Sequence, residues 1–281
     1  VLGNKKTARV LAAVVVFFAS AILFAAEPRA TATTSPAPVP PRRLIHEYHQ
    51  PLYELRVMQA SPGKLDALHA RIRDHQIPIM EQHGLTTLAV FVPAGENPNE
   101  LVLLVFVANA LGGMVEGLEG LREDPKWLEV MAETDKDGKL LAREYRERLN
   151  TISWSPKFPP EENSQEPRVF ELRTYTSPDR SKHTALLRRF REHTRKLFEK
   201  HGMENIVYWI PEGDPDNAKR LIYLLGHKSI ESAKESFAAF RKDPEWVEAK
   251  KQSEEKRGSL TAEKNGVVSE FLVATQYSPL R

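Results

Sequence analysis

The sequence predicts an α+β fold in which one domain occurs twice in tandem, because three short motifs appear in the same order in both halves. The motif pairs are Tyr53-Glu54-Leu55-Arg56 with Phe170-Glu171-Leu172-Arg173, His83-Gly84-Leu85 with His201-Gly202-Met203, and Asp124-Pro125-Lys126-Trp127 with Asp243-Pro244-Glu245-Trp246. The spacing within each pair is about 117 to 120 residues, the size of a small domain and too long for a solenoid repeat.

The first copy follows the order β-α-β-β-α-β. Alternating residues predict strands, apolar residues at helical spacing predict helices, and Gly84 is a typical helix stop. Pro125 suits a first helical turn capped by Asp124. The elements expected here are strands over 52–58, 85–92, 101–107 and within 144–154, a helix over 64–83, and helical segments on both sides of Asp124-Pro125.

The second copy repeats this order. Its expected elements are strands over 169–176, 205–210, 221–226 and 267–276, and helices over 179–201, 230–242 and 244–257. The order is that of a ferredoxin-like unit, whose helices cover one sheet face only. A second copy is the simplest cover for the other face, so we expect the two tandem units to form an α+β barrel. Pairing of each half with its equivalent in another chain, and so a homo-oligomer, stays open.

The chain start is typical of an export signal: Lys5, Lys6 and Arg9 precede an apolar run that ends in Phe24-Ala25-Ala26. The alternative is an uncleaved membrane anchor, since the run is at the short limit of a spanning helix. We expect the body to be exported, periplasmic or secreted. The expected division is a signal over 1–26, a Pro/Thr/Ala-rich linker over 27–43, a first domain over 44–156, a linker over 157–167 and a second domain over 168–281.

Composition excludes several classes of function. The chain has no cysteine, which rules out disulfides and thiolate catalysis. Without the three basic residues of the signal, the formal net charge falls from +2 to −1, so nucleic acid is not an expected partner. No phosphate-binding loop, nucleophile elbow or dinucleotide motif is present. Asp135-Lys136-Asp137-Gly138 is too short for a calcium loop. We therefore expect no metal and no cofactor.

The motifs of the second copy resemble the NIPSNAP family, in the segments Phe170–Tyr175, Phe198–Gly202, Val207–Pro211 and Phe240–Trp246. The first copy matches less closely and has Met58 where the second has Tyr175. The resemblance implies membership of the dimeric α+β barrel superfamily, which includes small monooxygenases and heme-active enzymes. It implies no agreed catalytic residues.

Two acid–base pairs are the first candidates for a site. Glu54 and Arg56 lie two apart on one strand and so share a face, as do Glu171 and Arg173. If this face points into the barrel, as we expect, the pairs are buried and either link the halves structurally or form a polar ligand pocket. Tyr175 gives the second half the more polar surroundings, so we expect it to hold the pocket that matters more.

The histidines also occur in equivalent pairs. His83 and His201 each precede a glycine at a helix end, where an imidazolium favours the helix dipole. His75 and His193 remain candidates for a pocket base or a heme ligand, although each is too far from its neighbouring histidine to share a metal. Trp127 and Trp246 are expected core anchors, and at most one of Tyr208 and Trp209 can face the barrel interior.

The leading hypothesis for function is a module that binds a small molecule or a protein. The rival is a cofactor-independent monooxygenase or isomerase that acts on a small apolar or aromatic substrate. An open cavity with Arg173, Tyr175 and His193 converging would favour the enzyme. A barrel filled by side chains would favour the binding module.

Overall fold

The structure is a computed structural model that describes residues 50–160, 168–213 and 219–281. The expected signal over 1–26, the linker over 27–43 and most of the linker over 157–167 lie outside these residues. Export therefore stays a prediction. None of the described helices is long and apolar enough to cross a membrane.

The first half has the predicted β-α-β-β-α-β order. Its elements are β1 (Leu52–Ala60), α3 (Leu65–Arg71), η1 (Ile72–Gln76), α4 (Ile77–Gln82), β2 (Thr86–Pro93), β3 (Leu101–Ala108), α5 (Leu111–Glu123), α6 (Pro125–Thr134) and β4 (Leu141–Thr151). Strand β4 begins before the predicted 144–154 window. Its first residue, Leu141, pairs with Ala60 across a register shift in β1, which lengthens the ladder.

The second half repeats the order with nearly the same lengths. Its elements are β5 (Val169–Thr176), α7 (Arg180–Arg189), η2 (Phe190–Thr194), α8 (Arg195–Lys200), β6 (Glu204–Pro211), β7 (Arg220–His227), α9 (Ile230–Lys242), α10 (Pro244–Glu254) and β8 (Val267–Ala274). The predicted helices over 64–83 and 179–201 are thus each interrupted by one π-helical turn, η1 or η2. Such turns often occur at functional sites.

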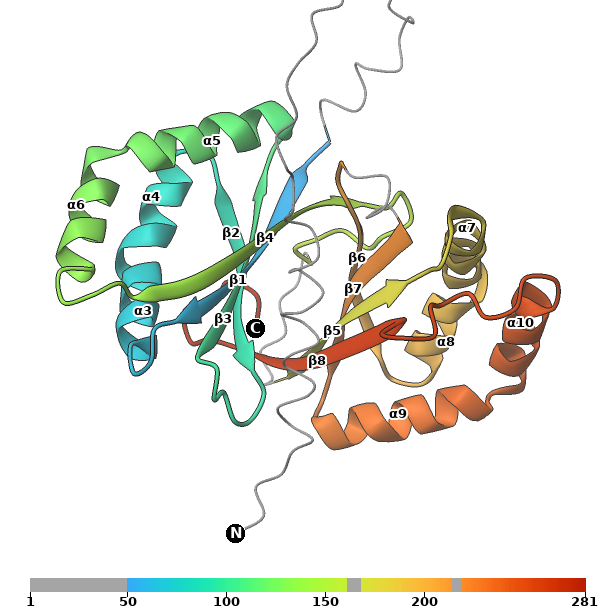
Figure 1. The fold of residues 1–281 in the computed structure, drawn as a ribbon. Coiled ribbons are helices and arrows are strands. Elements are labelled where there is room, and N and C mark those ends of the chain that lie inside the picture. The colour runs from blue at the N-terminus through green and yellow to red at the C-terminus, as the bar shows by residue number, and fades with distance from the viewer. Residues whose placement is uncertain (1–49, 161–167, 214–218) are drawn as a thin grey trace, which may run out of the picture.

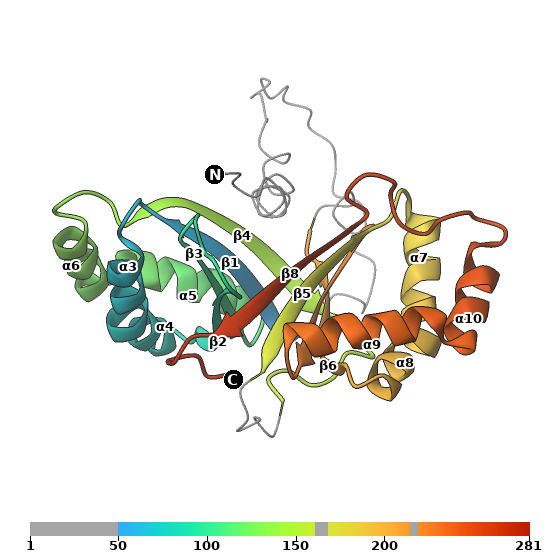
Figure 2. The same ribbon diagram turned by 90° about the horizontal axis from the view of Figure 1, so that it is seen from below.

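The eight strands form one closed barrel in the order β1-β3-β2-β8-β5-β7-β6-β4. Each half supplies four neighbouring strands, and the halves join where β2 pairs with β8 and where β4 pairs with β6. The helices lie outside the barrel, α3 to α6 on one side and α7 to α10 on the other (Figures 1 and 2). The prediction that a single tandem chain builds the barrel is confirmed.

The apolar core has three parts. The barrel interior is packed with side chains from both halves, and a separate cluster lies between sheet and helices in each half. Interior residues include Tyr53, Leu55, Val57, Phe91, Leu103, Phe170, Trp209, Leu224 and Leu272. As expected, only one of the two neighbouring aromatics is interior: Trp209 faces the barrel, and Tyr208 packs under the helices.

The repeated Asp-Pro motif ties the helices of each half together. One carboxylate oxygen of Asp124 caps α6 by accepting the Trp127 amide, and the other lies 3.0 Å from Nε2 of His83. Asp243 repeats both contacts, with the Glu245 amide and, at 2.8 Å, with His201. The two histidines therefore bind the cap of the next helix. The tryptophans of the motif are only half-buried, against the helix-side clusters.

Candidate functional site

The acid–base pairs lie on the helix side of the sheet, which corrects the expectation that they point into the barrel. In β1, Tyr53, Leu55 and Val57 occupy the dry interior, so Glu54 and Arg56 alternate to the opposite face. Arg56 Nε donates to Glu54 at 2.7 Å, and its guanidinium stacks 4.8 Å from the centre of the Phe106 ring. Both side chains are 5% exposed or less.

In the second half the equivalent pair belongs to a larger polar cluster. Glu171 accepts from Arg173 Nη1 at 2.5 Å through one oxygen and lies 3.1 Å from His227 Nε2 through the other. Arg173 also donates to the hydroxyls of Tyr223, at 2.9 Å, and Tyr175, at 3.3 Å. Its guanidinium lies 4.5 Å from the Phe237 ring centre.

Electrostatics keep this cluster charged. Burial by itself raises the pKa of Glu171, but the hydrogen bond from His227 and the charge of Arg173 outweigh it and lower that pKa below its ordinary value. Burial holds the pKa of Tyr223 well above its ordinary value, so the phenol stays protonated. The cluster is therefore a neutralised ion pair surrounded by aromatic rings.

The first half lacks the three residues that complete this cluster. Arg56 pairs across the sheet with Leu104, whereas Arg173 pairs with Tyr223. Met58 stands where the second half has Tyr175, and Ala108, opposite Leu52, stands where it has His227. Smaller or more flexible groups thus replace two tyrosines and a histidine.

A cleft of about 560 Å³ opens beside Arg56, and we call it the first-half cleft. It lies between the helix-facing side of β1 and β4 and the helices α3, α5 and α6. Its lining residues are Arg56, Met58, Leu68, Arg71, Gln76, Val115, Leu118, Glu119, Leu121, Arg122, Trp127, Leu128, Met131, Leu141, Glu144, Arg146 and Arg148. Arg173, by contrast, is in contact with the aromatic side chains of Tyr175, Tyr223 and Phe237.

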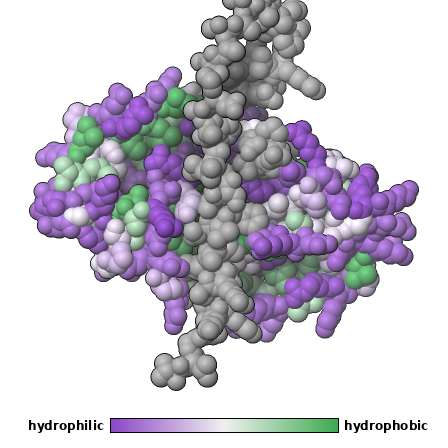
Figure 3. Space-filling view, in the orientation of Figure 1, coloured by the Kyte–Doolittle hydropathy of each residue, from purple (hydrophilic) through white to green (hydrophobic). Residues whose placement is uncertain are grey.

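The first-half cleft combines an apolar wall with a basic rim. Val115 and Leu128 on its wall are 38% and 54% exposed, and only two other large apolar side chains of the described residues are comparably exposed. Figure 3 shows hydrophobic surface beside α5 in this half, flanked by polar surface. Arg122, Arg146 and Arg148 reach solvent, with side chains 70%, 57% and 40% exposed.

The barrel interior contains one ion pair that joins the two halves. Arg220, at the start of β7, donates through both terminal nitrogens to the two carboxylate oxygens of Glu147 on β4, one of them at 2.8 Å. The two residues are 8% and 9% exposed. Such a pair is strong only because its geometry is bidentate.

Glu270 is the counterpart of Glu147 but has no such partner. Leu272 pairs with Pro93 as Leu149 pairs with Pro211, so the carboxylates two residues earlier occupy equivalent places in the barrel. Leu101 begins β3 where Arg220 begins β7. Oε2 of Glu270 is buried without a hydrogen-bond partner, and burial raises the pKa of this residue from 4.5 to about 6.

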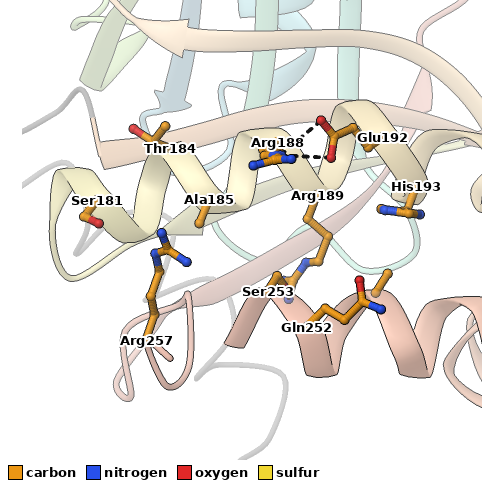
Figure 4. Close-up of a pocket in the computed structure, with 11 residues that line it drawn as sticks. Ser181, Thr184, Ala185, Arg188, Arg189, Glu192, His193, Gln252, Ser253 and Arg257 are labelled. Atoms are coloured by element: carbon orange, nitrogen blue, oxygen red, sulfur yellow. Dashed lines mark hydrogen bonds and ion pairs between the residues drawn. The ribbon is translucent and has the colours of Figure 1, made fainter. Parts of the chain in front are cut away.

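His75 and His193 do not join these clusters. Both lie in the π-helical turns, half-buried on the helix layer. His193 lines a groove between α7 and α10, in which it faces Gln252 (Figure 4). Among the described residues, the closest ionic contact of His193 is with Glu245, and neither Arg173 nor Tyr175 lines its groove, so the three do not converge. Among the described residues, no three His, Asp or Glu side chains group as a metal site requires.

Sequence reasoning missed four residues that hold these sites together. Tyr223 and His227 support Arg173 and Glu171, and Arg220 and Glu147 pair inside the barrel. A signal was present for Arg220, because it is the only charged residue in an otherwise apolar and aromatic strand that ends at His227. Nothing in the sequence marks Glu147 among the other charged residues of β4.

Comparison with known families finds one match that covers both halves. The sequence pattern named NIPSNAP matches residues 53–156 and again residues 170–279. These two segments correspond to the two copies that the repeated motifs identify. Among curated proteins, none matches the chain.

Several solved structures are similar in fold. A candidate monooxygenase from Lactobacillus acidophilus NCFM is 12% identical, with a TM-score of 0.48 over 80% of this chain and 94% of that chain. An anthrone oxidase-like protein is 11% identical, with a TM-score of 0.48 over 82% and 94%. A NIPSNAP family protein with unknown function from Agrobacterium tumefaciens is 20% identical, with a TM-score of 0.33 over 38% and 94%.

Proposed function

The chain belongs to the NIPSNAP family, and we propose that it is a binding module whose first-half cleft takes a small amphipathic anion, such as a fatty-acid-like carboxylate. The observation that carries this proposal is the pairing of exposed apolar side chains with solvent-exposed arginines around one cavity. Val115 and Leu128 offer contact to an apolar chain, and Arg122 lies at the rim.

The size and charge of the first-half cleft support this ligand class. Its volume of about 560 Å³ lies within the range of small-molecule pockets. Five arginines and two glutamates line it, which favours an anion. Glu144 is already held by Arg146 at 2.5 Å and by Arg56 at 3.7 Å. Arg122 and Arg148 have only the longer contacts of 3.5 Å to Glu123 and 3.8 Å to Glu54, so these two exposed arginines are the more available to an anion.

Binding is favoured over catalysis by the chemistry of the same lining. Apart from Glu119 and Glu144, the described residues around the cleft include no histidine, tyrosine, lysine or aspartate, and Glu144 is already bound to Arg146. An acid–base catalyst needs a group that exchanges a proton near neutral pH. The barrel, where the rival hypothesis places its substrate, is packed with apolar side chains.

The duplication supplies matched variants for the test. Leu128 and Val247 follow the tryptophan of the two Asp-Pro motifs and are 54% and 53% exposed. Arg122 and Arg241 occupy the last turns of α5 and α9. We expect Leu128→Gln and Arg122→Gln to weaken the binding of dodecanoate, measured by isothermal titration calorimetry. Val247→Gln and Arg241→Gln should leave it unchanged.

Each ligand control separates one part of the proposal. Dodecyltrimethylammonium has the same chain with the opposite charge and should bind more weakly than dodecanoate. Equal loss in the first-half and second-half variants would refute the assignment to the first-half cleft. Absence of dodecanoate binding to the wild-type chain would refute the ligand class.

A further inference from the structure

A second cavity lies in the other half, between α7 with its π-helical turn and α10. This groove has a volume of about 510 Å³, and we call it the α7–α10 groove. Its lining residues are Ser181, Thr184, Ala185, Arg188, Arg189, Glu192, His193, Ala249, Gln252, Ser253 and Arg257. Figure 4 shows polar side chains from both walls directed into the space between them. The lining is polar except for two alanines.

The arginines differ in how far their charges are already satisfied. Arg188 is bound to Glu192 at 3.0 Å on the solvent side. Arg189 donates to Ser253 at 3.1 Å and to Glu254 at 2.8 Å, yet its Nε is buried without an acceptor. The guanidinium of Arg257 has no hydrogen bond or ion pair with any residue that the structure describes, and it points at the α7 wall in Figure 4.

His193 adds a second buried nitrogen without a hydrogen bond. Its Nδ1 is buried, and the closest carboxylate oxygen, Oε1 of Glu245, is 3.8 Å away, beyond hydrogen-bond length. A buried donor without an acceptor is costly to the folded protein. The unpaired guanidinium of Arg257 and the imidazole of His193 offer donors to an acceptor-rich ligand in this cavity.

The first half shows which of these features are structural. Arg71 repeats the contacts of Arg189, donating to Thr134 at 3.2 Å and to Asp135 at 2.8 Å, and its Nε is likewise buried without an acceptor. This link fastens the helices together in both copies, and the unpaired Nε belongs to it. The cations at the rim are not repeated. Ala70 is the first-half equivalent of Arg188. Asp137 is the equivalent of Arg257, because each directly precedes the glycine after the last helix of its half, Gly138 or Gly258.

We propose that the α7–α10 groove binds the phosphoryl group of a phosphate monoester. Phosphoryl oxygens accept several charge-assisted hydrogen bonds at once, and arginine is suited to them in geometry as well as in charge. The hydroxyl of Ser181 on the α7 wall can donate to a remaining oxygen, whereas those of Thr184 and Ser253 already donate to the carbonyls of Arg180 and Lys250. The groove is larger than a single phosphate needs, so the ligand carries an organic group as well. This site is separate from the first-half cleft and does not depend on its ligand.

The test compares glycerol 3-phosphate with glycerol by isothermal titration calorimetry on the full chain. We expect glycerol 3-phosphate to bind and glycerol not to bind. Arg257→Gln removes an exposed cation that has no structural partner, and we expect it to weaken binding about tenfold. His193→Gln should also weaken it. Arg241→Gln removes the same charge from α9, outside the groove, and should leave the affinity unchanged.

Two further arms identify the source of the phosphoryl group. Inorganic phosphate should bind more weakly than glycerol 3-phosphate if the organic group is held. Vesicles of phosphatidylcholine with phosphatidic acid test a lipid headgroup, and binding to them that depends on Arg257 would assign the site to a lipid monoester. Equal effects of Arg257→Gln and Arg241→Gln would overturn the proposal, because attraction by net charge would then explain the binding. Failure of every phosphate compound to bind the wild-type chain would also overturn it.

Discussion

The unpaired carboxylate of Glu270 inside the barrel leads to a prediction about stability and pH. Its pKa in the folded protein is about 6, above the ordinary 4.5, because burial disfavours the ionised form. A group with a raised folded pKa stabilises the protein below its unfolded pKa and loses that contribution as pH rises through the folded value. Wild-type stability should therefore fall, from this cause, between about pH 4.5 and pH 7.

The magnitude follows from the size of the shift. A difference of 1.5 pKa units corresponds to about 2 kcal/mol at most. Glu270 is half-buried, so solvent screens part of this cost, and we expect about 1 kcal/mol. Glu270→Gln keeps the shape and removes the charge. It should match the wild type near pH 4.5 and become about 1 kcal/mol more stable by pH 7.

Urea unfolding at pH 4.5, 5.5, 6.5 and 7.5 measures this difference, and other titrating groups cancel because both proteins contain them. Glu147→Gln is the matched control. It leaves Arg220 buried without its partner, so it should destabilise the protein at neutral pH instead. A gap between Glu270→Gln and wild type that stays constant from pH 4.5 to 7.5 would refute the reasoning. Leu101→Arg in the wild-type background should supply the missing cation, so the stability of this variant should no longer fall, from this cause, between pH 4.5 and pH 7.

Two other predictions concern the architecture. Arg173→Ala should lower the free energy of unfolding in urea by roughly 3 to 5 kcal/mol, because Glu171 is only 1% exposed and loses its guanidinium partner. The double variant Arg173→Met with Glu171→Leu should recover much of that loss. A loss near zero for Arg173→Ala would show that the pair does not matter. Residues 44–160 and 161–281 expressed separately should each fail to melt cooperatively as monomers, since each would expose its side of the barrel interior at about 25 cal/mol per Å². Two well-behaved monomers in analytical ultracentrifugation would contradict this.

The order of the strands and helices, and their bounds to within a few residues, could be read from the sequence because local patterns determine them. Gly84, Gly202 and Gly258 end helical segments with positive φ angles, as their positions indicate. The motif repeat also predicted the closed barrel. The π-helical turns could not be predicted, since neither Ile72–Gln76 nor Phe190–Thr194 departs from an ordinary helical pattern.

The alternating pattern of the strands could not predict which face of the sheet the acid–base pairs occupy. Alternation shows that Glu54 and Arg56 share a face, but β1 is buried on both faces, so neither face is marked as the outer one. The choice depends on which set of side chains fills the barrel, and that set comes from eight strands. Whether Glu54, Arg56, His75, Glu171, Arg173, Tyr175 and His193 bind a ligand stays a prediction. The structure places the cavities beside Arg56 and His193.

The covalent link between the two halves changes how this barrel can evolve. In a barrel assembled from two identical chains, every substitution appears twice, on both sides of the symmetry axis. Here a substitution appears once. Arg220 could therefore arise opposite Glu147 while Leu101 remained at the equivalent position of the other half, and tyrosines could surround Arg173 while a cleft stayed open beside Arg56. Because of the duplication, neither half has to be compatible with an identical, rotation-related copy of itself. One chain therefore carries two different cavities, one of each kind per molecule.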